Sequence, residues 1–204
     1  MSIFPQFSCI IGDAMIMLIF FLICVFVTMG IGVLAGIADF RAMTIPNHYS
    51  VYVIALFVLA YGVMALGGGA YYAFKPIQWH LASAGLMFVV TFAMFGLRLI
   101  GAGDSKFASA CALWVSLRDL PAFIFYMTIM GALLGVAALV MRRRKPFANA
   151  MAGGWVDQVQ NGASKVPYGI AISFGMIIAF VQAGYFSPDV LSHFVASAAG
   201  GQAS

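Results

Sequence analysis

The chain has 204 residues, of which 64% are hydrophobic and only 8% are charged, and its formal net charge is +4 at pH 7. Soluble domains carry about 25% charged residues, so this composition excludes an ordinary soluble domain and indicates a polytopic membrane protein. The positive charge does not indicate nucleic-acid binding, because four cations form one run, Arg142-Arg143-Arg144-Lys145, directly after an apolar segment, as in membrane proteins.

Six apolar runs are candidates for membrane-spanning helices, each of which needs about 20 mostly apolar residues. We predict them at about 14–38, 48–66, 79–100, 105–117, 121–141 and 167–186. The fourth run is short. The first continues beyond the length of a signal peptide and is expected to be a retained helix. The whole chain, 1–204, is therefore expected to form one all-α, membrane-embedded domain.

The distribution of Lys and Arg predicts the orientation of these helices. With the N-terminus outside, eight of the ten cations fall on the cytoplasmic side, and only Lys75 and Arg118 fall on the outer side. Cytoplasmic loops of membrane proteins carry such an excess. The prediction is therefore an N-out, C-out protein of the cell inner (cytoplasmic) membrane, with residues 142–165 as a cytoplasmic loop.

The acidic residues are few, six Asp and no Glu, so each can be assessed in turn. On the predicted topology Asp39 closes the first span and Asp104 opens the fourth, which places both at the cytoplasmic end. The other four have capping or loop explanations: Asp13, Asp119, Asp157 and Asp189. A carboxylate at membrane depth is costly, so this pair is the functional candidate.

Two facing carboxylates can share a proton, so that one activates water while the other protonates a carbonyl or a leaving amine. This is the chemistry of aspartic proteolysis, and it needs no metal or cofactor. The partial charges at helix ends predict Asp104, at the start of its helix, as the ionised base and Asp39, at the end of its helix, as the protonated acid. Gly101 and Gly103 allow unusual backbone conformations and close approach of another chain, and Pro46 forces a turn.

Two motifs carry a family resemblance. Gly101-Ala102-Gly103-Asp104 is a G-x-G-D sequence followed by Lys106, and residues 39–47, DFRAMTIPN, are similar to a D-x5-I-P-N signature. Together they resemble the type IV prepilin peptidases, and residues 165–169, KVPYG, resemble a later motif of that family. The resemblance implies six helices and catalytic Asp39 and Asp104. It implies that the site is supported by Gly101, Gly103, Lys106, Pro46 and Asn47, without metal or cofactor.

The resemblance also implies a substrate and partners. The family cleaves a short basic leader from pilin-like precursors at the cytoplasmic face of the bilayer and serves pilus secretion machinery. The short form looks most like the branch for Flp-type tight-adherence pili. The paired C-x-x-C motifs and N-terminal extension of the bifunctional members are missing from this sequence, so we expect protease activity without methyltransferase activity.

Three alternatives stay open. An archaeal-type preflagellin peptidase would share the same motifs. A proton-coupled transporter or channel could use the same aspartate pair in broken helices, although both acids lie at one face and the sequence has no repeat. A non-catalytic assembly subunit would leave both aspartates replaceable.

Overall fold

The computed structural model describes residues 4–67, 69, 73–147, 151–163, 165–192 and 194, with side chains from Met15 onward. Throughout these residues the regular structure is helical and there is no strand. The main helices are α1 (Phe4–Ala42), α2 (Asn47–Leu66), α4 (Ile77–Gly96), α5 (Ala102–Trp114), α6 (Leu120–Arg144), α7 (Trp155–Gln160) and α8 (Tyr168–Gln182). The predicted all-α class is therefore confirmed.

A helix lies at each of the six predicted positions, but several bounds differ. α1 continues to Ala42, so Asp39 lies inside its last turn. α5 begins at Ala102, three residues before the predicted start, and Asp104 therefore lies inside its first turn. The early start follows from Gly101, whose extended backbone (φ −78°, ψ 155°) makes it the N-cap residue.

Two further bounds correct the sequence prediction. α4 ends at Gly96 because Arg98 adopts a left-handed conformation (φ 60°), and a helix cannot continue through it. The segment 142–165 is not only a loop, because α6 extends through Arg144 and α7 forms within it. Trp155 and Val159 of α7 bury their side chains against Ala138 of α6, which explains why this short helix is stable.

In the described part of the chain, four helices are long and apolar enough to cross a membrane: α1 from Met15, α2, α4 and α6. α5 and α8 are shorter, with 13 and 15 residues. At about 1.5 Å per residue they fall short of a hydrocarbon core about 30 Å thick. The helices as a set indicate a polytopic membrane protein, with two short helices among longer ones.

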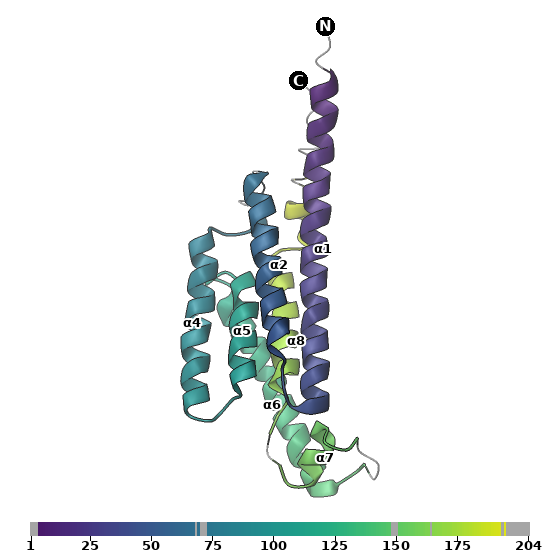
Figure 1. Cartoon of the computed structure of the whole chain (residues 1–204), viewed down its shortest axis with the longest axis vertical. Helices are drawn as coiled ribbons and strands as arrows, with labels where there is room; N and C mark the ends of the chain where they lie inside the picture. Colours follow the sequence, from purple (N-terminus) through teal and green to yellow (C-terminus); the bar gives the residue numbers. More distant parts are fainter. Residues whose placement is uncertain are drawn as a thin grey trace.

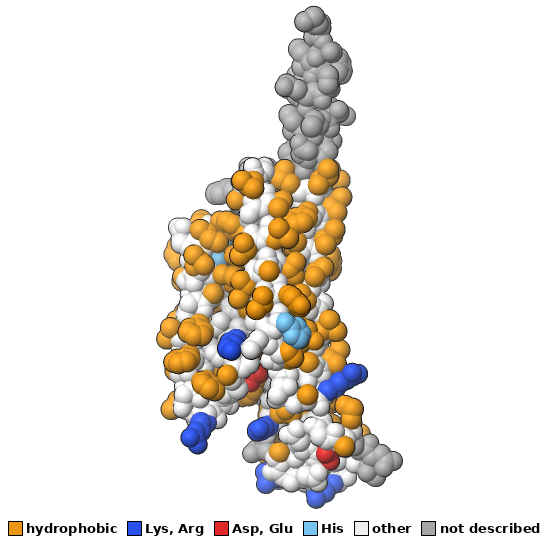
Figure 2. Space-filling model, in the orientation of Figure 1, with side chains coloured by type: hydrophobic (Ala, Val, Ile, Leu, Met, Phe, Trp, Pro, Cys, Tyr) orange, Lys and Arg blue, Asp and Glu red, His pale blue; other side chains and the backbone are white. Residues whose placement is uncertain are grey.

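The two short helices form the centre of the bundle (Figure 1). α8 packs against α1, α5 and α6, and α5 packs against α2, α4 and α8. From Phe107 to Trp114 every residue of α5 except Ser109 is buried. The longer helices instead expose large apolar side chains, such as Val58 and Val89, which are 62% and 64% exposed. Figure 2 shows these hydrophobic side chains over the body of the molecule, as expected for a surface in contact with lipid.

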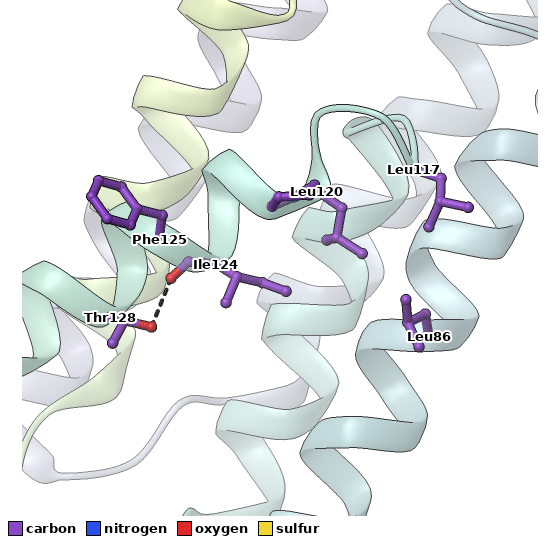
Figure 3. A pocket seen from close by; sticks show the side chains of 7 residues that line it. Leu86, Leu117, Leu120, Ile124, Phe125 and Thr128 are labelled. Atoms are coloured by element: carbon purple, nitrogen blue, oxygen red, sulfur yellow. Dashed lines mark hydrogen bonds between the residues drawn. The ribbon is translucent and has the colours of Figure 1, made fainter.

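An apolar groove of about 530 Å³ lies between α4 and α6 on this lipid-facing surface. Figure 3 shows Leu86 of α4 on one side and Ile124 and Phe125 of α6 on the other. The hydroxyl of Thr128 donates a hydrogen bond to the Ile124 carbonyl (2.7 Å), so it adds no unpaired polar group to the groove.

α6 and α8 approach each other closely at Gly175. A Cβ atom on Gly175 would lie 2.9 Å from the Phe123 carbonyl oxygen and 3.0 Å from the Met127 amide nitrogen, both of which are backbone atoms. Small residues at such contacts let helix backbones pack tightly inside a membrane. The contact fixes α8, and with it the start of α8 near Asp39.

We predict opposite effects for alanine at two glycines of this helix pair. Gly175→Ala should lower the free energy of unfolding by about 2 kcal/mol, because the added methyl group overpacks a backbone contact. Gly135→Ala is the matched control, since nothing lies within 4 Å of its would-be Cβ. Alanine there should leave stability unchanged or raise it by up to about 1 kcal/mol. Thermal unfolding in detergent measures both, and equal melting temperatures would contradict the close α6–α8 contact.

Candidate active site

The end of α1 and the starts of α5 and α8 meet near α7, at what we call the α7 end of the bundle. They line a cavity of about 510 Å³ to which both Asp39 and Asp104 contribute. The other lining residues are Met43, Phe95, Arg98, Leu99, Ile100, Gly101, Lys165, Val166 and Tyr168. In Figure 2 the surface is hollowed between the end of α4 and α7, with an acidic side chain visible at the hollow. The predicted pair of acids therefore shares one cavity.

Asp39 is held by the start of α8. Its side chain is only 4% exposed, and its Oδ2 atom accepts a hydrogen bond from the Gly169 amide (2.7 Å). The first amides of a helix have no acceptor within the helix, so the carboxylate supplies one. A Cβ on Gly169 would lie 2.9 Å from the Asp39 Cβ and 3.0 Å from the Ile45 Cδ1, so a larger residue would separate α8 from Asp39.

Asp104 is held by the turn that precedes α5. Its Oδ2 atom accepts a hydrogen bond from the Gly101 amide (3.0 Å). This is the reciprocal contact of a capping box, in which the third residue of a helix reaches back to the N-cap amide. It fixes the carboxylate at the helix start, facing the cavity it shares with Asp39.

The two glycines of G-x-G-D leave room for neighbouring atoms because they have no side chain. Neither adopts a backbone angle that favours glycine. Gly101 is extended and Gly103 is helical, and neither has a positive φ. A Cβ on Gly103, however, would lie 3.0 Å from the Ile45 carbonyl oxygen. The two glycines thus adopt no conformation special to glycine, and the space at Gly103 is taken by the turn at Ile45 of this chain.

The remaining supporting residues connect the two motifs outside the cavity. The Lys106 ammonium donates a hydrogen bond to the Asn47 side-chain oxygen (3.3 Å). Pro46 occupies the N-cap position of α2. None of these three residues lines the cavity. They hold the turn between α1 and α2 against α5, which keeps the segments that carry Asp39 and Asp104 together.

Two cations also line the cavity, and the sequence alone did not assign them to the site. Arg98 comes from the turn after α4, where its left-handed backbone (φ 60°) is costly for a residue with a side chain. Lys165 comes from the segment before α8. Among the described residues no salt bridge links either cation to the acids. The only sequence signals were their positions, Arg98 just before G-x-G-D and Lys165 at the start of the KVPYG motif.

The geometry defines what the pair can do chemically. One oxygen of each carboxylate is fixed by a backbone amide, and the other accepts no hydrogen bond from the described part of the chain. Two carboxylates in one cavity titrate as a coupled pair. Asp104 lies at the positive N-terminal end of α5. Asp39 lies in the last turn of α1, as the sequence argument assumed, but its carboxylate also accepts a hydrogen bond at the positive start of α8, which opposes the effect of the α1 end. Over the described residues, no three metal-ligating side chains gather.

Comparison with known proteins gives the family. The chain is 26% identical over 152 residues to the "Prepilin leader peptidase/N-methyltransferase" of Bacillus subtilis (strain 168), a match that covers 70% of this chain and 57% of that protein. The chain thus spans little more than half the length of that relative. No solved structure gives a significant match. A sequence model of the type IV leader peptidase family matches residues 26–136, which include Asp39, Asp104 and more than half of the chain. The chain belongs to the type IV leader peptidase family.

Proposed function

We propose that this protein is a membrane aspartic endopeptidase that removes the short basic leader from type IV pilin-like precursors. The observation that carries the proposal is the shared cavity of Asp39 and Asp104 at the α7 end of the bundle. Family membership supports a peptidase, and the similar Bacillus protein is named a prepilin leader peptidase. Both findings favour this function over a proton-coupled transporter or a non-catalytic assembly subunit.

In the proposed reaction the two carboxylates share one proton. The ionised carboxylate takes a proton from a water molecule, and the resulting hydroxide attacks the scissile carbonyl carbon. The protonated carboxyl donates its proton to the carbonyl oxygen, and a proton passes to the leaving amine when the C–N bond breaks. The amides of Gly169 and Gly101 each orient one carboxylate oxygen, which leaves the other oxygen for water and peptide.

The charges in the cavity bear on how the substrate lies. Asp39 and Asp104 are balanced by Arg98 and Lys165, so the cavity as a whole has no strong attraction for a basic leader. The run Arg142–Lys145 also repels such a leader and is better suited to anionic lipid headgroups. We therefore propose that the scissile peptide enters the cavity extended, with the basic residues of the leader outside it.

We also propose that the protein lacks methyltransferase activity, acts on one class of pilin and has a defined orientation in the membrane. The Cys residues, at positions 9, 24 and 111, form no C-x-x-C pair, which supports a peptidase without methyltransferase activity. The resemblance of residues 39–47 to the D-x5-I-P-N motif supports a pilin-like substrate, and we propose an Flp-type pilin with pilus secretion machinery as a partner. The excess of Lys and Arg at the α7 end supports an N-out, C-out arrangement in the inner membrane.

Replacing either acid should abolish cleavage. We expect Asp39→Asn and Asp104→Asn each to lower leader removal by about a thousandfold or more, because neither remaining carboxylate can serve as both acid and base. The assay is co-expression with a pilin-like precursor and detection of the shift in size on a gel.

Asp119→Asn is the matched control for this experiment. Asp119 precedes α6 and accepts a hydrogen bond from the Ser116 hydroxyl (2.6 Å), away from the cavity. It should retain wild-type cleavage. Cleavage that persists in either Asp39→Asn or Asp104→Asn would exclude the aspartic mechanism.

The orientation can be tested at the two ends of α6. Arg118 and Arg143 are both exposed and flank most of this helix. In a variant without native cysteines, Arg118→Cys should react with an impermeant maleimide in intact cells. Arg143→Cys should react only after the membrane is permeabilised. The reverse pattern would place Asp39 and Asp104 at the outer face and contradict cleavage at the cytoplasmic face.

A further inference from the structure

A small lobe at the α7 end has its own hydrophobic core. Trp155 and Val159 of α7 are buried against Ala138 of α6, and Met43 and Met141 pack on this cluster. Figure 1 shows α7 next to the end of α6 and below the end of α1. The lobe does not supply either acid, but it borders the cavity that contains them.

Trp155 connects this lobe to two other segments. Its side chain is 4% exposed, and its Nε1–H group donates a hydrogen bond to the Lys165 carbonyl (2.9 Å). Its ring packs edge-on against Phe40, with ring centroids 5.6 Å apart. Phe40 directly follows Asp39, and Lys165 lies four residues before Gly169. Trp155 therefore contacts both segments that supply the partners of the Asp39–Gly169 hydrogen bond.

The segment that leads into α8 has little backbone support of its own. Pro167 has no amide hydrogen, and its conformation (φ −75°, ψ 89°) is not helical. The Trp155 indole is the side-chain donor that fixes the Lys165 carbonyl in this segment. Gly169 already lies so close to Asp39 that its would-be Cβ is 2.9 Å from the Asp39 Cβ. A small displacement of the start of α8 would therefore break the hydrogen bond to Asp39 or create a clash.

We propose that Trp155 is a positioning residue for Asp39. It holds the end of α1 to the start of α8 and so keeps the Asp39 carboxylate on the Gly169 amide. The inference rests on the proposed function for its effect on cleavage. Its structural part, that Trp155 maintains the Asp39–Gly169 hydrogen bond, stands without that function.

The test compares two tryptophans that make the same kind of hydrogen bond. Trp155→Phe keeps an aromatic ring against Phe40 but removes the N–H donor. Trp114→Phe is the matched control, because the Trp114 Nε1–H group also donates to a buried carbonyl, that of Val53 (3.0 Å). Trp114 lies ten residues along α5 from Asp104, about 15 Å away.

Trp155→Phe should lower kcat for leader cleavage about tenfold and leave KM within about twofold, because the substrate still binds beside a misplaced acid. Trp114→Phe should leave kcat within about twofold even where its melting temperature falls. An unchanged kcat in Trp155→Phe, or an equal loss of kcat in both variants, would overturn the proposal. Phe40→Leu removes the ring contact from the other side and should lower kcat in the same direction.

Hydrogen exchange of the Gly169 amide gives a second readout that needs no cleavage. Asp39→Ala removes the acceptor and sets the fast limit of exchange. Trp155→Phe and Phe40→Leu should each move the rate toward this limit by about tenfold, whereas Trp114→Phe should keep the wild-type rate. Wild-type exchange in Trp155→Phe would overturn the inference. Absence of cleavage by the wild-type protein would instead remove the proposed function and leave the exchange result to decide the role of Trp155.

Discussion

The hydrogen bond from the Gly169 amide to the Asp39 carboxylate joins residues 130 positions apart and fixes the geometry of the candidate site. A buried carboxylate is costly unless a polar partner compensates for the loss of water. The start of α8 supplies that partner, because its first amides have no acceptor inside the helix. The same contact satisfies the helix and the acid, so α1 and α8 depend on each other at the α7 end of the bundle.

This arrangement depends on where the two central helices begin. α5 and α8 begin within the cavity region, so that their N-terminal amides and the residues before them meet the acids there. Longer helices around them face lipid and isolate the centre of the bundle. An extra turn at the N-terminal end of either central helix would displace the Gly101 amide that holds Asp104 or the Gly169 amide that holds Asp39.

Close backbone contacts hold these starts in place. Gly103 lets α5 lie against the turn at Ile45, Gly169 lets α8 lie against Asp39, and Gly175 lets α8 lie against α6. At each position a methyl group would meet an atom within about 3 Å, which is closer than van der Waals contact allows. The small lobe around Trp155 adds a further connection between α1 and α8. The cavity is thus defined by several contacts between segments that are distant in the sequence.

The sequence by itself determined the membrane class and predicted the approximate helix positions and the candidate pair Asp39 and Asp104, because apolar runs, charge bias and two ordered motifs are local patterns. It also identified Lys106 and Asn47, although only the fold showed that they hydrogen-bond to each other. Tertiary structure decided which helix end each acid faces: Asp39 ends its own helix, yet its carboxylate lies at the start of α8. It also brought Arg98, Lys165 and Trp155 to the cavity or its border. The positions of these side chains depend on how helices that are distant in the sequence pack together, and no single segment contains that information.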